Sequence, residues 1–147
     1  MFVLDTNVVS ELRQPARSNP RVLAWAASQP IAAQFLSVIT VLELELGVLQ
    51  KERKDAVQGA ILRNWLDGKV LPQFAGRVLP LDQPVASRCA RLHIPDPHAE
   101  RESIIAATAL VHGMTIVTRN VADFESMGVP VMNPWAQSRH PTNARQV

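Results

Sequence analysis

Short apolar runs and amphipathic stretches alternate along the whole chain. The apolar runs predict β-strands at residues 1–5, 34–38, 77–81, 114–118 and 129–132. Between them, apolar side chains recur with the helical period, which predicts helices over residues 7–13, 20–30, 40–51, 55–67, 82–93, 100–112 and 121–127. Proline or glycine ends several of these stretches, as at Pro15, Pro30, Gly113 and Gly128.

Strands that alternate with helices are typical of parallel sheets built from βαβ units. The sequence therefore predicts an α/β domain of three layers, in which helices flank a roughly five-stranded, mostly parallel sheet. The chain has 147 residues, 47% of them hydrophobic, which suits one domain with its own core. We expect the domain over residues 1–135. Residues 136–147 contain basic residues and no acids, and we expect them to form a basic C-terminal tail.

Composition narrows the classes of protein further. The single cysteine, Cys89, excludes an internal disulfide framework, and its helical setting favours a small core residue over a reactive thiol. No apolar run reaches the ~18–20 residues that span a bilayer, and Asp5 interrupts the N-terminal run early. We therefore expect neither a membrane span nor a signal peptide, and a cytoplasmic location.

The net charge of +2 does not by itself predict binding to nucleic acid. The type of basic residue is more informative, because 12 of the 15 are arginine, whose planar group suits phosphate. For any single arginine, a solvated position on a helix is the simpler interpretation.

Four acidic residues lie where predicted strands give way to helices: Asp5, Glu43, Glu102 and Asp123. The carboxyl ends of parallel strands meet at one edge of the sheet, which is where open α/β domains bind their ligands. Four convergent carboxylates predict a site for a hard divalent cation and metal-assisted hydrolysis. Thr118 and Asn120 fall at the same predicted edge as Asp123.

Each acid also has a structural interpretation. Asp5 suits the N-cap of the first helix, a role that is compatible with a functional one. Thr40 and Glu43 have the spacing of a capping box, and on spacing alone that interpretation is the stronger one for Glu43. Glu102 falls in the first turn of a helix, where the macrodipole favours an acid. Asp123 suits the solvated face of a short surface helix. The shared sheet edge favours a functional interpretation of the set.

Other chemistries fit the sequence poorly. It contains neither a glycine-rich phosphate loop nor a nucleophile elbow. The four histidines form no pair at helical ligand spacing, and with one cysteine a zinc site is not expected. His93 and His98 flank the loop before the helix at 100–112, where both a place at the rim of the site and a solvated loop position stay open.

Four pieces of the sequence together resemble a known family. They are residues 5–12 (DTNVVSEL), Glu43, residues 104–109 (IIAATA) and residues 118–124 (TRNVADF). As a set they are similar to the PIN domain, and more narrowly to the VapC/FitB-type ribonuclease toxins, which include StbB-like plasmid stability proteins. The resemblance runs from Met1 to about Trp135.

The resemblance implies an endoribonuclease that depends on Mg²⁺ or Mn²⁺ and serves as the toxin of a type II toxin–antitoxin module. It implies catalytic roles for Asp5, Glu43, Glu102 and Asp123, with Asp5 and Glu102 as metal ligands. It implies supporting roles for the polar residues Thr6, Asn7, Thr118 and Asn120. The family usually has aspartate where this chain has Glu102. The added methylene moves the carboxylate by roughly one bond length, enough to disturb octahedral Mg²⁺ coordination. A catalytically weak PIN module that acts by binding RNA or a partner is therefore the alternative function.

The resemblance also implies partners. These are an RNA substrate and a cognate VapB/FitA-like antitoxin, with a homodimer of the toxin inside a heterotetrameric or larger complex. DNA would be contacted only through the antitoxin, and no membrane is implied. Independently, Val9, Leu12 and Trp25 on the early helices either receive a partner helix or belong to the core, and the sequence leaves both open.

Overall fold

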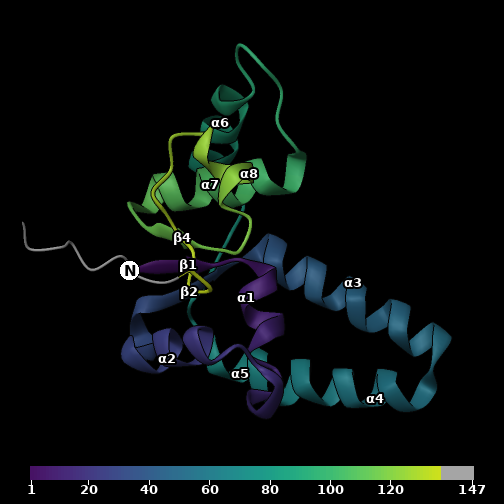
Figure 1. Cartoon of the computed structure of the whole chain (residues 1–147). Helices are drawn as coiled ribbons and strands as arrows, with labels where there is room; N and C mark the ends of the chain where they lie inside the picture. Colours follow the sequence, from purple (N-terminus) through teal and green to yellow (C-terminus); the bar gives the residue numbers. More distant parts are fainter. Residues whose placement is uncertain (137–147) are drawn as a thin grey trace, which may run out of the picture.

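Five parallel strands lie between two layers of helices in the computed structural model, which describes residues 1–136 (Figure 1). The strands are β1 (Phe2–Leu4), β2 (Gln34–Ser37), β3 (Val78–Leu79), β4 (Thr115–Val117) and β5 (Val131–Met132). Their order across the sheet is β3-β2-β1-β4-β5, and every neighbouring pair is parallel. The predicted three-layer α/β fold is confirmed. The basic tail predicted for residues 136–147 lies outside the described residues, apart from Ala136.

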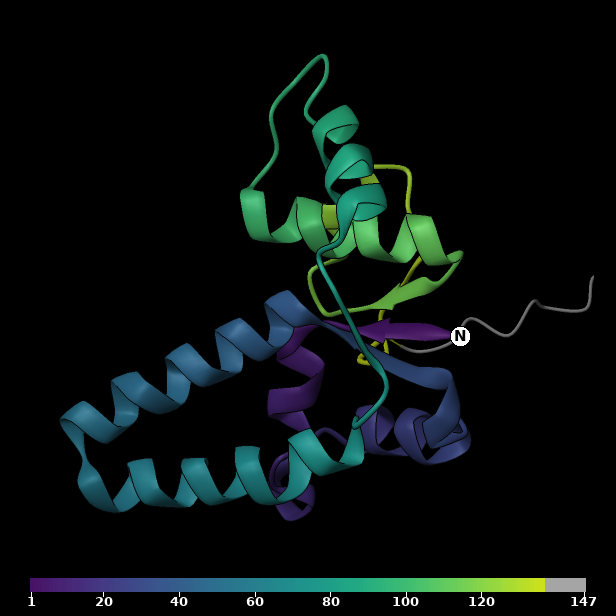
Figure 2. The same cartoon turned by 180° about the vertical axis from the view of Figure 1, so that it is seen from behind.

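Helices connect the strands on both faces of the sheet. They are α1 (Thr6–Glu11), α2 (Pro20–Ser28), α3 (Val38–Lys54), α4 (Ala56–Trp65), α5 (Leu71–Gln73), α6 (Gln83–Leu92), α7 (Glu100–His112) and α8 (Val121–Glu125). Short 3₁₀ turns occupy Pro15–Arg17 and Ile31–Ala33. Helices α6, α7 and α8 form one layer and α1 to α5 the other (Figures 1 and 2). No helix within residues 1–136 combines the length and apolarity that a membrane crossing needs.

The side chains of the central strand β1 alternate between the two layers. Val3 is buried on the side of α7 together with Ile105. Leu4 is buried on the opposite side, in a cluster that includes Val22 of α2. A parallel strand covered on both faces is apolar at successive positions, and this accounts for the unbroken run that ends at Asp5.

The start of α3 differs from the prediction. The helix begins at Val38, two residues earlier than expected, because Ser37 at the end of β2 is its N-cap and accepts a hydrogen bond from the amide of Ile39 at 3.1 Å. Thr40 is buried inside the helix instead of capping it. The capping-box interpretation of Thr40 and Glu43 is therefore wrong, and the Glu43 side chain is available for another role.

The helix predicted over residues 55–67 also differs in detail. Helix α4 ends at Trp65, and the chain continues through a wider π-helical turn, Leu66–Val70, into α5. Leu66 and Val70 are both buried, at 0% and 3% exposure. Their burial one turn apart outweighs the helix-breaking tendency of Gly68 between them.

A long hairpin of α3 and α4 projects from the sheet (Figure 2). Asp55 forms its corner and caps α4, accepting a hydrogen bond from the amide of Gln58 at 3.1 Å. Arg63 of α4 joins the two helices through Glu45 at 2.8 Å and Glu52 at 3.0 Å. At Gly59 the helices approach so closely that a Cβ atom would overlap the Cα of Glu52 and lie 2.7 Å from its amide nitrogen.

This close approach predicts that a glycine-to-alanine change at this helical position lowers the stability of the protein. Alanine normally stabilises a helix by about 0.5–1 kcal/mol relative to glycine. Gly59→Ala should instead lower the free energy of unfolding by about 1–3 kcal/mol, because the backbone of Glu52 must move away. Urea denaturation measures the change. Gly47→Ala is the matched control, since a Cβ there meets no atom within 4 Å, and it should be neutral or stabilising. A Gly59→Ala protein as stable as the control would contradict the packing of α3 on α4.

Candidate active site

Asp5 follows the last residue of β1, in the middle of the sheet, and begins α1. Its Oδ1 accepts a hydrogen bond from the amide of Thr6 at 2.8 Å, so the predicted N-cap is confirmed. The residue is only 8% exposed. A cap position turns the carboxylate toward the carboxyl edge of the sheet, where the sequence predicted the site.

Side chains from two neighbouring strand ends fix the other oxygen of Asp5. The buried hydroxyl of Thr118, just past β4, donates to Asp5 Oδ2 at 2.8 Å. Asn7 Nδ2 donates to the same oxygen at 3.3 Å, and Asn7 Oδ1 accepts the amide of Arg119 at 3.3 Å. Thr118 Oγ1 in turn accepts the amide of Asn120 at 3.0 Å. The structure thus brings the predicted supporting residues around Asp5, with Asn120 taking part through its backbone.

Glu43 reaches the same region from α3. Its Oε1 accepts a hydrogen bond from the hydroxyl of Thr6 at 2.9 Å, and Thr40 Oγ1 lies 3.5 Å from that hydroxyl. Its Oε2 lies 3.8 Å from Nη1 of Arg101, at the start of α7. Thr6 therefore links the two acids, because its amide donates a hydrogen bond to Asp5 and its hydroxyl donates one to Glu43.

Glu102 and Asp123 belong to α7 and α8. Both line one cavity together with His98. Glu102 is in the first turn of α7, as its structural interpretation also required, and Asp123 is exposed in the first turn of α8. The four predicted acids therefore divide into Asp5 with Glu43, which share Thr6, and Glu102 with Asp123, which share a cavity.

The two histidines of the loop before α7 have different surroundings. His93 is held by the protein: its Nδ1 accepts the amide of His98 at 3.1 Å, and its Nε2 lies 3.0 Å from Ser103 Oγ. The half-buried side chain of His98 lines the cavity of Glu102 and Asp123. The sequence left open whether the two histidines lie at the rim of the site or in a solvated loop. His98 lies at the rim.

Burial is the main influence on the ionisation of Asp5. It raises the pKa of the Asp5 carboxyl above its ordinary value of 3.8. The hydrogen bonds from Thr118 and Thr6 oppose this rise, while the negative charges of Glu43 and Glu102 add to it. The influence of Glu102 on Asp5 connects the two halves of the acidic site. Ionisation of Asp5 therefore costs more than that of an exposed carboxyl, and a nearby positive charge would lower this cost.

The donor set fits a hard divalent cation. Carboxylate oxygens are the ligands that Mg²⁺ prefers, and it is usually held by one or two of them together with water and substrate phosphate oxygens. Within residues 1–136 no three His, Cys, Asp or Glu side chains stand close enough to hold an ion by themselves. A site in which Asp5 and Glu102 supply two ligands, and water and phosphate the others, is consistent with the ligand preference of Mg²⁺ and with the lack of a three-residue cluster in this part of the chain.

Arg101 is the residue near these acids that the sequence analysis missed. A signal was present, because an arginine in the first turn of a helix is opposed by the helix dipole and needs another reason to be there. Its contact with Glu43 depends on how α3 and α7 meet, and no local pattern predicts that meeting.

Comparisons with known proteins identify the family of the chain. The sequence model of the PIN domain matches residues 2–129. Toxin FitB of Neisseria gonorrhoeae is 41% identical over 143 residues, covering 92% of this chain and 99% of that protein. VapC ribonuclease Y4jK of Sinorhizobium fredii is 40% identical over 140 residues, covering 92% and 98%. The crystal structure of FitAcB from Neisseria gonorrhoeae superimposes with a TM-score of 0.85 at 39% identity, covering 93% of this chain and 100% of that one.

The raised pKa of Asp5 predicts how stability depends on pH without metal. Below pH 3.8 the carboxyl is protonated in both the folded and the unfolded chain. Between pH 3.8 and the raised pKa, Asp5 is largely ionised in the unfolded chain but still largely protonated in the folded one. The contribution of this group to the free energy of unfolding is therefore lost as the pH rises through this range. Asp5→Asn keeps the group neutral at every pH. In EDTA, its melting temperature relative to the parent should therefore increase from pH 4 to pH 7. A difference that stays constant or shrinks over that range would contradict the stated cause.

Proposed function

The chain belongs to the PIN domain family, and on this premise we propose that it is a Mg²⁺- or Mn²⁺-dependent endoribonuclease that acts as the toxin of a type II toxin–antitoxin module. Relatives that match nearly their full length are named as a toxin and as a ribonuclease. The observation that carries the proposal is the buried Asp5 carboxylate at the end of the central strand, with the charges of Glu43 and Glu102 acting on it.

In this proposal Asp5 and Glu102 hold the cation. When bound, such an ion polarises a phosphate oxygen and lowers the pKa of a coordinated water. The remaining residues position groups for hydrolysis of the phosphodiester. Thr118 and Asn7 fix the orientation of Asp5 through its Oδ2. Thr6 occupies Glu43 Oε1, which leaves Glu43 Oε2 to accept a proton from the attacking water. Asp123 completes the acidic lining beside Glu102.

A second function has one observation in its favour, the longer side chain of Glu102. If this carboxylate misplaces the cation, the protein is a catalytically weak PIN module that acts by binding RNA or a partner. The two functions differ in what Glu102→Asp should do, because the shorter side chain restores the usual ligand length.

The metal site predicts a matched set of activities. Parent protein should cleave a mixed single-stranded RNA pool with Mg²⁺ or Mn²⁺ and stop in EDTA. Asp5→Asn should lower the cleavage rate by at least ~100-fold without lowering the melting temperature, because it removes a ligand and a buried charge. Glu102→Gln should abolish both cleavage and the heat of Mg²⁺ binding measured by calorimetry, whereas Glu102→Asp should keep or raise both.

Glu100→Gln is the control for the helix-dipole role of Glu102, since Glu100 shares the first turn of α7 but does not line the cavity. A dipole effect alone costs ~0.3–1 kcal/mol of stability and leaves cleavage intact. Unchanged Mg²⁺ binding in Glu102→Gln would remove Glu102 from the metal site, and full cleavage by Asp5→Asn would refute the ribonuclease mechanism. Cleavage that appears only in Glu102→Asp would favour the weak module.

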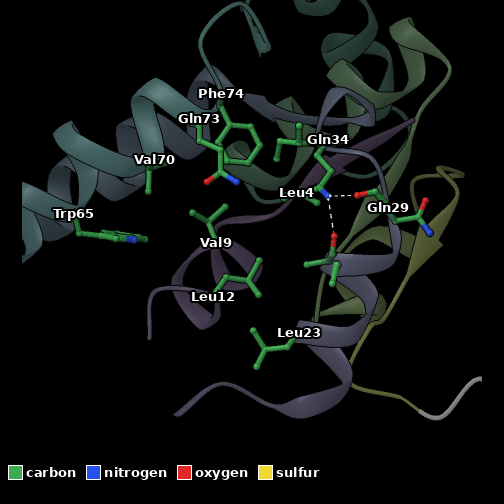
Figure 3. A pocket seen from close by; sticks show the side chains of 13 residues that line it. Leu4, Val9, Leu12, Leu23, Gln29, Gln34, Trp65, Val70, Gln73 and Phe74 are labelled. Atoms are coloured by element: carbon green, nitrogen blue, oxygen red, sulfur yellow. Dashed lines mark hydrogen bonds between the residues drawn. The ribbon is translucent and has the colours of Figure 1, made fainter. Parts of the chain in front are cut away.

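We further propose that the antitoxin occupies an apolar cavity on the face of the sheet opposite α7. The cavity, of about 600 Å³, lies between α1, α2 and the segment from α4 to α5 (Figure 3). Its lining is apolar apart from three glutamines, Gln29, Gln34 and Gln73. Gln34 donates to the carbonyls of Ala26 and Gln29, each at 3.3 Å, so its amide is already satisfied (Figure 3). Such a lining suits the apolar face of a partner helix.

Two of the three apolar residues singled out in the sequence line this cavity. Val9 is buried at 5% exposure and Leu12 is half-buried, and both face it. Trp25 instead packs edge-on against Phe2, with ring centroids 5.2 Å apart, and contributes to the core. On the hairpin, α3 exposes a stripe of leucines at helical spacing, Leu42, Leu46 and Leu49. We assign this stripe to the interface between two copies of the toxin. In this proposal, DNA is contacted through the antitoxin alone.

The cavity predicts which substitutions on α2 weaken the complex. Ala27 is exposed and lines the cavity, so Ala27→Arg should weaken binding of the co-expressed antitoxin by at least ~10-fold without changing the melting temperature. Ala24→Arg is the control, since Ala24 is exposed on the same helix but does not line the cavity. Calorimetry measures affinity, and light scattering should give two toxins and two antitoxins. Equal binding by both variants would place the antitoxin elsewhere.

A further inference from the structure

We infer that Arg101 binds a backbone phosphate of the RNA next to the scissile one, an inference that rests on the proposed ribonuclease function. Arg101 is the second residue of α7 and immediately precedes Glu102. Its Nη1 lies 3.8 Å from Glu43 Oε2, which places the guanidinium at the edge of the acidic site. The other ion pairs described in residues 1–136 all belong to Arg63 on the distant hairpin.

The contact between Arg101 and Glu43 is easily exchanged. The two side chains are 49% and 27% exposed, and an ion pair of this length between such solvent-accessible groups contributes little to stability. Glu43 does not depend on it, because Thr6 already donates to its other oxygen at 2.9 Å. Arg63 shows the contrast: it meets Glu45, Glu52 and Asp67 at 2.8–3.5 Å and ties helices together. Arg101 is held near the site without being fixed there.

The position of Arg101 also disfavours a purely structural role. The positive end of the helix dipole opposes a cation in the first turn, so Arg101 does not stabilise α7. Its flexible, half-exposed side chain can instead turn from Glu43 toward a ligand at the rim.

An RNA strand is the ligand that this placement suits. The acidic lining repels a polyanion, and a positive charge at its edge lowers the cost of approach. A guanidinium donates two parallel hydrogen bonds to a phosphate, which fixes the orientation of the strand as well as attracting it. Since Glu43 Oε2 is the group proposed to receive a proton from water, a phosphate that draws Arg101 away would also free that oxygen.

The experiment compares three variants of the full chain: Arg101→Gln, Arg101→Lys and the control Arg53→Gln. Arg53 is exposed in the last turn of α3. The end of this helix lies away from the sheet (Figure 1). Initial rates on single-stranded RNA with Mg²⁺ give kcat and KM at several salt concentrations, and calorimetry gives the Mg²⁺ affinity. Arg101→Gln should raise KM about 10-fold, with kcat and Mg²⁺ affinity close to those of the parent. The slope of log KM against log salt should fall by about 0.7, the value for one phosphate contact on a single strand.

Arg101→Lys should keep the salt slope and recover part of the loss in KM, because it retains the charge but not the planar fork. Arg53→Gln should resemble the parent. If Arg101→Gln keeps the parental KM and salt slope, Arg101 binds no phosphate. If it binds Mg²⁺ more tightly at unchanged KM, Arg101 is a competitor of the metal, and the inference is overturned. A parent protein that cleaves no RNA overturns the proposed function and this inference together, whereas the first two results leave the proposed function intact.

Discussion

The buried carboxylate of Asp5 is the constraint on which the rest of this site depends. A charge at 8% exposure is costly, and three donors from two strand ends partly offset that cost. Each donor fixes an element relative to β1: Thr6 and Asn7 fix the start of α1, and Thr118 fixes the end of β4. The hydrogen bonds that orient Asp5 therefore also hold the carboxyl edge of the sheet in one arrangement.

The helices that bring the other acids to this edge are positioned by packing on the two faces of the sheet. Small residues let α7 lie close to the sheet, with Ala106 and Ala109 fully buried beside Val3. This places the first turn of α7, with Arg101 and Glu102, at the strand ends. On the opposite face Leu44 anchors α3 in the other core cluster, so its neighbour Glu43 reaches Thr6. One apolar core on each side thus sets the spacing between acids that are far apart in the sequence.

The sequence predicted much of this arrangement, because the relevant signals are local. The apolar run before Asp5, the glycine that ends α7 and the polar cluster at Thr118 all identify strand and helix ends without knowledge of the fold. The prediction failed where two local signals compete or where contacts are non-local. Ser37 and Thr40 both suit an N-cap, and the end of β2 at Ser37 decides between them. The pairing of Arg101 with Glu43 joins two helices on opposite faces of the sheet, so only the folded chain reveals it.

Both the proposed function and the role of Arg101 require that Asp5 and Glu102 together bind a divalent cation. The most direct measurement is anomalous diffraction from crystals of this protein soaked in MnCl₂, since the strongest anomalous peak locates the ion independently of activity. We expect a peak within coordination distance, about 2–2.3 Å, of carboxylate oxygens of both Asp5 and Glu102. A peak at other residues, or none at Asp5 under conditions where Mn²⁺ supports cleavage, would contradict it.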